Sequence, residues 1–145
     1  MNRELIFKKT EQIRVLLREL QQLLNLSYSD FQKDFIIVRA SERSFQLIVD
    51  LAVDINTQLL VEQTGKTPDT YRQSFSELER AGIMAGEFIK TLAESAKLRN
   101  VIVHEYDIEE DIKKFYDSAK KMIPAYQDYI QAILLYCKRD TGVPS

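Results

Sequence analysis

The sequence predicts an all-α protein, a bundle of about five helices, and three observations lead to that prediction. The 145 residues include only four Gly and three Pro, so few turns are available to join short elements. Apolar residues recur at helical intervals over several long segments. The apolar–polar alternation that is typical of half-buried strands is not found in the pattern. Long helices with one apolar face each are expected to pack together as a bundle.

The first two predicted helices are long. The first extends from Asn2 to about Asn25, with its apolar residues on one face and lysine and arginine residues outside that face. The second runs from Phe31 to the loop that begins at Gly65, with no Gly or Pro between them. Its length is up to about 33 residues, or roughly 50 Å. The dipeptide Ser29-Asp30 offers its N-terminal cap.

The third and fourth predicted helices lie on either side of a glycine. A short helix begins after Asp69-Thr70, either of which can cap it, and stops near Gly82. The next helix runs from Ile83 to about Val103, and Arg99 continues its apolar stripe. Because a charged group on a buried face must be paired, Arg99 is expected to contact a carboxylate, a backbone carbonyl or an anionic ligand.

The last predicted helix follows Asp107, which can cap it, and Pro124 is expected to kink it. A single helical domain is predicted over residues 1–139, with a flexible C-terminal tail over residues 140–145. Cys137 falls in the apolar stripe of this helix and is expected to be a packed thiol. Four tyrosines on or near the same stripe are expected to be core or interface aromatics: Tyr116, Tyr126, Tyr129 and Tyr136.

Composition argues against several classes of protein. The formal net charge is −2, so the molecule as a whole does not attract nucleic acid, and any polyanion must be held by a local patch. The N-terminus is charged from the start and lacks an apolar segment of signal-peptide length, and no membrane span is expected. One cysteine cannot form an internal disulfide, which fits a reducing compartment. The simplest expectation is a cytoplasmic protein without a membrane partner.

The candidate functional residues gather where the fourth helix ends. Arg99, His104 and Tyr106 lie within eight residues and include the only histidine of the chain. On an unbroken helix His104 lies about 140° around and about 7.5 Å along from Arg99, whereas Asn100 and His104 share a face. Arg99 and His104 therefore converge only if the helix ends near Val103, or if a second chain brings its copy across a two-fold axis.

The pairing of an arginine with a histidine suits phosphodiester cleavage. A histidine with a reference pKa of about 6.5 can transfer protons in both directions near neutrality. The planar guanidinium of Arg99 is suited to the non-bridging oxygens of a transition state. Taken alone, His104 is explained equally well as a surface or helix-capping histidine.

No metal site or resident cofactor is predicted. One histidine, one cysteine and scattered carboxylates give no ligand cluster at zinc spacing. Asp50 and Asp54, four residues apart on the second predicted helix, can in principle bind magnesium. A solvated helix face explains the two carboxylates more simply.

The segment Arg99-Asn100-x3-His104-x-Tyr106 resembles the Arg-x4-His-x-Tyr motif of the HEPN superfamily, in particular of its HepT-like proteins. The resemblance covers nearly the whole chain. It extends through Asp34-Phe35, Arg39-Ala40 and Ile48 to Asn56 on the second predicted helix, Thr67-Pro68-x2-Tyr71 in the loop, and Ala81-Gly82-Ile83 before the motif helix.

This resemblance implies a symmetric HEPN homodimer that acts as the toxin of a bacterial or archaeal toxin–antitoxin pair. Members of the family are metal-independent endoribonucleases in which the RNA 2′-OH attacks the adjacent phosphate and leaves a 2′,3′-cyclic phosphate. Arg99 and His104 occupy the catalytic positions in a dimer cleft, and Asn100 would orient the substrate or the histidine.

The implied partner is an MntA-like minimal nucleotidyltransferase antitoxin, with which the dimer could form a higher hetero-oligomer. In related systems the partner adenylylates the tyrosine at the position of Tyr106. An AMP group there would place a bulky anion beside the cationic site and block RNA.

Two other functions stay open at the level of the sequence. The chain could be a non-catalytic helical subunit that binds a minimal nucleotidyltransferase and presents a nucleotide or a tyrosine to it. It could also be a purely structural helical dimer. Loss of RNA cleavage on mutation of Arg99 or His104 would favour the nuclease over both alternatives.

Overall fold

The structure is a computed structural model that describes residues 2–104 and 108–140, without the side chains of 108–110 and 140. Within these ranges every regular element is a helix, and the all-α prediction is confirmed. Six helices are present: α1 (Arg3–Leu24), α2 (Tyr28–Lys33), α3 (Phe35–Thr64), α4 (Tyr71–Arg80), α5 (Phe88–His104) and α6 (Ile108–Asp140).

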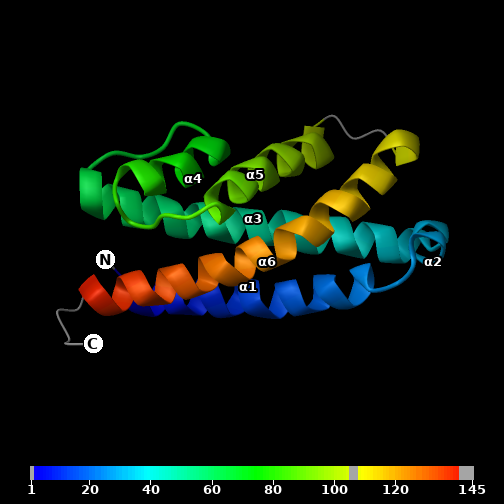
Figure 1. Cartoon of the computed structure of the whole chain (residues 1–145), viewed down its shortest axis with the longest axis horizontal. Helices are drawn as coiled ribbons and strands as arrows, with labels where there is room; N and C mark the ends of the chain where they lie inside the picture. The colour runs from blue at the N-terminus through cyan, green and yellow to red at the C-terminus, as the bar shows by residue number, and fades with distance from the viewer. Residues whose placement is uncertain (1, 105–107, 141–145) are drawn as a thin grey trace.

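The long helix α3 is the centre of the bundle. It contacts each of the other five helices. Figure 1 shows α1 and α6 along one side of α3, and α4 and α5 along the other. Each of the six helices contributes fully buried side chains to one continuous core. This core holds the bundle together.

Helix α3 is also the only described helix that is long and apolar enough to cross a membrane, with a mean hydropathy of 1.2 over an 18-residue window. No membrane span is expected from the apolar pattern of the sequence. Inside the bundle 50% of that window is buried, and the core helix of a globular protein has the same character. The apolar composition of α3 is therefore accounted for by its central position.

One predicted helix is in fact two. The helix expected from Phe31 to Gly65 is interrupted at Asp34, which ends α2 and begins α3. The Asp34 carboxylate accepts hydrogen bonds from the backbone N–H groups of Ile36, at 3.0 Å, and Ile37, at 3.3 Å. An aspartate that satisfies the free N–H groups of a new first turn competes with continuation of the old helix. The cap of α2 is Ser27 rather than Ser29 or Asp30.

The predicted start of the fourth helix at Ile83 is wrong, because α5 begins only at Phe88. Gly82 and Gly86 have φ angles of 72° and 148°, which are incompatible with a continuous helix. Ile83 and Met84 are buried in the connection between the two glycines. Their apolar character reflects burial of a connecting segment and not helical periodicity.

Helix α6 continues on both sides of Pro124. Its buried face includes Cys137, which confirms the predicted packed thiol, and Tyr116, Tyr126 and Tyr129, which are almost entirely buried as predicted. The expected cap Asp107 and residues 141–145 of the expected tail lie outside the described residues, whereas Asp140, the first residue of that tail, is the last residue of α6.

Candidate active site on helix α5

The predicted site residues lie on the last two turns of α5, where the side chains become progressively more exposed. Leu92 and Ala96 are fully buried, Arg99 is half-buried, and Asn100 and His104 are exposed. The helix is unbroken to His104, its last residue. The divergence of about 140° between Arg99 and His104 is therefore retained within one chain.

Side chains from three helices meet at the Arg99 guanidinium. Its Nε donates to Oδ1 of Asp50 on α3 at 3.0 Å. The ring of Tyr71, in the first turn of α4, has its centroid 4.7 Å from the guanidinium carbon. Nη1 of Arg99 donates to Oδ1 of Asn100 at 3.3 Å. The prediction that Arg99 requires a partner is confirmed, and the partner is a carboxylate.

The Arg99–Asp50 ion pair lies in a largely sheltered position, with side-chain exposures of 15% and 29%. Shelter from water strengthens the charge-assisted hydrogen bond relative to a surface ion pair. The interpretation of Asp50 and Asp54 as a solvated face is therefore wrong for Asp50. Asp54 is more exposed and forms an ion pair with Lys9 at 3.1 Å. No three His, Cys, Asp or Glu side chains in the described parts of the chain form a metal-binding group.

Tyr71 is a site residue for which the sequence alone predicted no role. Burial raises the pKa of its hydroxyl above the usual value of 10.0, and the negative charge of Asp50 raises it further, while the positive charge of Arg99 acts in the opposite direction. Tyr71 is therefore a neutral phenol at physiological pH. The sequence held two signals: Tyr71 is part of the Thr67-Pro68-x2-Tyr71 segment of the HEPN resemblance, and it directly follows the capping residue Thr70.

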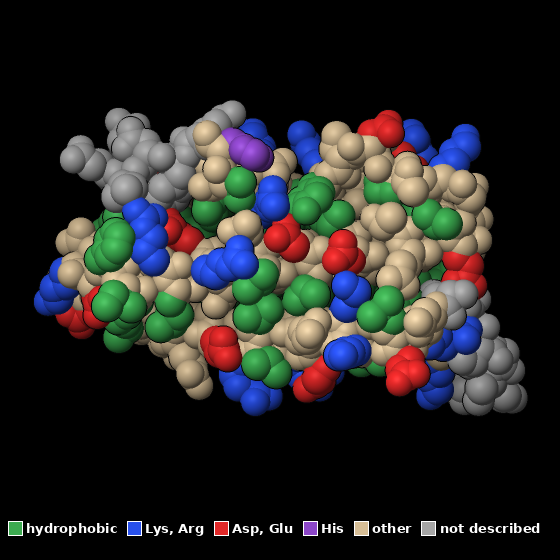
Figure 2. All heavy atoms as spheres, turned by 180° about the vertical axis from the view of Figure 1, so that it is seen from behind, with side chains coloured by type: hydrophobic (Ala, Val, Ile, Leu, Met, Phe, Trp, Pro, Cys, Tyr) green, Lys and Arg blue, Asp and Glu red, His purple; other side chains and the backbone are tan. Residues whose placement is uncertain are grey.

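The four predicted site residues are thus brought together only in part. Arg99 and Asn100 are in contact, but His104 stands apart on the exposed end of α5, and Figure 2 shows it in purple at the surface. Tyr106 lies outside the described residues. A single chain supplies both Arg99 and His104, but it does not bring these two side chains together.

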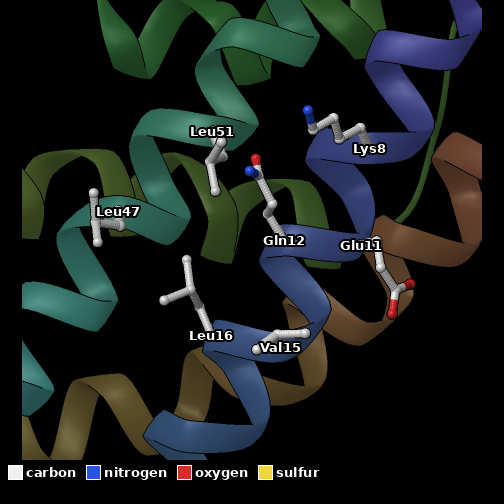
Figure 3. A pocket seen from close by; sticks show the side chains of 7 residues that line it. All are labelled: Lys8, Glu11, Gln12, Val15, Leu16, Leu47 and Leu51. Carbon is white, nitrogen blue, oxygen red and sulfur yellow. The ribbon is translucent and has the colours of Figure 1, made fainter.

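An open apolar groove lies beside this site, between α1 and α3. Figure 2 shows hydrophobic side chains gathered near the middle of the same face, and Figure 3 shows side chains of both helices around the groove. Its volume is about 710 Å³, and one of its residues, Leu51, directly follows Asp50. The lining residues are Lys8, Glu11, Gln12, Val15, Leu16, Leu47 and Leu51.

The helical bundle has the architecture of the HEPN class of proteins. The family model described as "Ribonuclease HepT-like" matches residues 13–133. The chain belongs to the HepT-like family.

A curated relative supports the assignment. The chain is 31% identical over 132 residues to a protein named tRNA nuclease HepT from Aphanizomenon flos-aquae (strain 2012/KM1/D3). The match covers 91% of this chain and 89% of the relative.

Solved structures share the fold. A crystal structure of the MntA–HepT toxin–antitoxin matches with a TM-score of 0.80 and 21% identity, and covers 91% of this chain and 98% of the other. A structure of the tri-AMPylated Shewanella oneidensis HEPN toxin in complex with MNT antitoxin matches with a TM-score of 0.65 and 21% identity, over 88% of this chain and 99% of the other. At these identities the likeness establishes the common fold.

Proposed function

We propose that this protein is the toxin of a toxin–antitoxin pair and acts as a metal-independent endoribonuclease, with Arg99 and His104 as its catalytic residues. One observation carries the proposal. The guanidinium of Arg99 is fixed by Asp50 and Tyr71, and it lies on the same helix that ends in the exposed His104. Membership of the HepT-like family and the similarity to a tRNA nuclease support it. RNA is the substrate, and the cytoplasm, where RNA is made and used, is the place of action.

The chemistry requires no group beyond the side chains of the site. The RNA 2′-oxygen forms a bond to the adjacent phosphorus, and the bond from phosphorus to the 5′-oxygen breaks, which leaves a 2′,3′-cyclic phosphate and a 5′-hydroxyl. His104 takes up the 2′-OH proton, and a protonated His104 gives a proton to the leaving oxygen. Arg99 stabilises the negative charge on the non-bridging oxygens. Asn100 orients the substrate or His104, its neighbour four residues along the helix.

The proposed active form is a symmetric homodimer. Arg99 and His104 diverge on one helix, so a two-fold arrangement can bring the His104 of one chain towards the Arg99 of the other. The apolar groove between α1 and α3 lies beside Asp50, the partner of Arg99. An interface that buries this groove would place two sites next to each other.

The proposed partner is an MntA-like nucleotidyltransferase that adenylylates Tyr106. The matched toxin–antitoxin structures support this part of the proposal through the common fold. Tyr106 is two residues beyond His104 in the sequence, so an AMP group on its hydroxyl would add negative charge close to the site and repel RNA.

The test is cleavage of total cellular RNA by the purified protein in the presence of a chelator, with Arg99→Ala and His104→Ala as comparison proteins. Cyclic phosphate ends that form only with the wild type are expected.

The test of regulation treats the protein with ATP and the nucleotidyltransferase. The wild type should then lose its activity, and Tyr106→Phe should keep it. Tight binding of the nucleotidyltransferase by a folded wild-type protein that leaves RNA intact would instead assign a non-catalytic subunit.

A further inference from the structure

We propose that Asp50 and Tyr71 are positioning residues that hold the Arg99 guanidinium so that the edge formed by its two Nη atoms meets the RNA phosphate. The inference rests on the proposed function. It assigns a role to two side chains on helices other than α5, and it states which side of the guanidinium faces the substrate.

The bond to Asp50 determines which edge of the guanidinium is free. A guanidinium can bind a phosphate through Nε and one Nη, or through both Nη atoms. Nε already donates to Oδ1 of Asp50 at 3.0 Å, in a pair whose side chains are 15% and 29% exposed. The edge that contains Nε is therefore occupied by a carboxylate, which would repel a phosphate. Only the edge formed by Nη1 and Nη2 remains for the substrate.

A count of donors leads to the same edge. A guanidinium has five N–H groups. Within the described part of the chain, Asp50 accepts one and Asn100 accepts another, which leaves three, all of them on the Nη atoms. Asn100 is exposed and its 3.3 Å contact is long, so a phosphate oxygen can displace it at little cost.

Tyr71 restricts the tilt of the guanidinium plane. Its ring centroid lies 4.7 Å from the guanidinium carbon, a distance typical of a cation–π contact. The backbone of Tyr71 is itself fixed, since the Ser74 hydroxyl donates to its carbonyl oxygen at 2.7 Å. That hydroxyl also accepts from Nδ2 of Asn56, a fully buried residue of α3, at 3.1 Å. The tyrosine is thus attached to the same helix that carries Asp50.

The positioning role has a kinetic signature that a purely structural role lacks. Asp50 is a negative charge beside the phosphate site, so its removal should not weaken RNA binding in the ground state. Removal does release Nε, which allows the guanidinium to rotate away from the transition state. We therefore expect kcat to fall while KM stays the same or decreases.

The first experiment compares Asp50→Ala with Asp54→Ala in cleavage of a short RNA. The two carboxylates lie one turn apart on α3, but Asp54 pairs with Lys9. Asp50→Ala should lower kcat by about tenfold without raising KM, and Asp54→Ala should change both by less than about twofold. Tyr71→Leu should lower kcat by about tenfold, whereas Tyr71→Phe, which keeps the aromatic face, should remain within about twofold of the wild type.

The second experiment uses guanidinium ion as the probe. Arg99→Ala leaves a space between Asp50 and Tyr71, and added guanidinium should partly restore cleavage. The concentration needed for half of the restored rate should rise by about tenfold in the double variant that also contains Asp50→Ala. The Arg99 Nε–H resonance, observed by NMR in the wild-type protein, should likewise lose its protection from exchange in Asp50→Ala.

The outcomes separate the inference from the proposed function. If the folded wild type does not cleave RNA, the proposed function is overturned and the inference with it. If the wild type cleaves RNA and Arg99→Ala does not, while Asp50→Ala and Tyr71→Leu keep the wild-type kcat, only the inference is overturned. An equal rise of KM in both tyrosine variants would also contradict it.

Discussion

At the scale of single residues, a buried chain of polar groups joins three helices behind the site. The Tyr129 hydroxyl on α6 donates to Oδ1 of Asn56 at 2.6 Å, and Nδ2 of Asn56 donates to the Ser74 hydroxyl on α4. All three residues have 0% exposure. Because each member satisfies the next, loss of one partner leaves a buried polar atom without a hydrogen bond.

Tyr129→Phe is therefore expected to lower the free energy of unfolding by about 1–3 kcal/mol, because Oδ1 of Asn56 loses its donor. Tyr136→Phe is the matched control, since the Tyr136 hydroxyl bonds to Gln63 at an exposed position, and it should cost less than about 0.5 kcal/mol. Urea unfolding followed by circular dichroism measures both values. Equal stability of the two variants would contradict a structural role for the buried chain.

Two buried tyrosines also predict how stability depends on alkaline pH. Burial raises the pKa of Tyr126 well above 10.0, against a smaller opposite effect of its hydrogen bond to Ser95, and burial likewise raises the pKa of Tyr129. The native state therefore keeps both protons at a pH where the unfolded chain loses them. The stabilisation is complete below about pH 10 and is lost as the pH rises above it, by up to about 1.4 kcal/mol per pH unit for each group.

The measurement is a titration of tyrosinate absorbance alongside circular dichroism. Tyr126 and Tyr129 should ionise only when the helical signal is lost. In Tyr126→Phe, only one tyrosine should ionise together with unfolding. Ionisation of all tyrosines before any loss of helix would rule out the proposed cause.

At the scale of elements, the break between α2 and α3 depends on one side chain. Asp34 is exposed, so its effect on stability comes from the two backbone N–H groups that it caps and not from burial. The break also leaves Phe35 and Ile36 at 65% and 76% exposure in the first turn of α3. A continuous helix would follow a different path at this end of the bundle.

Asp34→Ala should lower the free energy of unfolding by about 1 kcal/mol, because the first turn of α3 loses its cap. Asp34→Asn keeps a capping oxygen and should remain within a few tenths of a kcal/mol of the wild type. Thermal unfolding of the three proteins provides the comparison. If Asp34→Ala is as stable as the wild type, the break must have another cause.

At the scale of the whole molecule, the proposed dimer depends on the groove between α1 and α3. Val15 lies in that groove with 45% exposure, and Val61 lies on α3 outside it with 43% exposure. The two valines are matched in type, exposure and helical setting. Only Val15 should be buried when two chains associate through the groove.

Val15→Lys is therefore expected to weaken self-association by at least about tenfold, because it places a charge in an apolar interface, and RNA cleavage should fall in parallel. Val61→Lys should leave both unchanged. Sedimentation velocity gives the mass at a series of concentrations. If Val15→Lys still forms an unaltered dimer, the interface lies on another face of the bundle.

The sequence by itself determined the all-α class, because helical periodicity and the scarcity of Gly and Pro are local properties. It also determined that Arg99 needed a partner, since a charge on a buried face cannot stay unpaired. The boundaries at Asp34 and Phe88 were not predictable in the same way. A capping carboxylate and two glycines compete with an apolar pattern that continues across them.

Only the tertiary structure decided which groups meet at Arg99. Asp50 and Tyr71 are 49 and 28 positions away from Arg99 in the sequence, and they reach it because α4 and α5 both pack against α3. Helical phase correctly predicted that Arg99 and His104 diverge, since it depends only on the residues between them. Contacts between helices depend instead on how their faces pack, and a single periodic pattern does not contain that information.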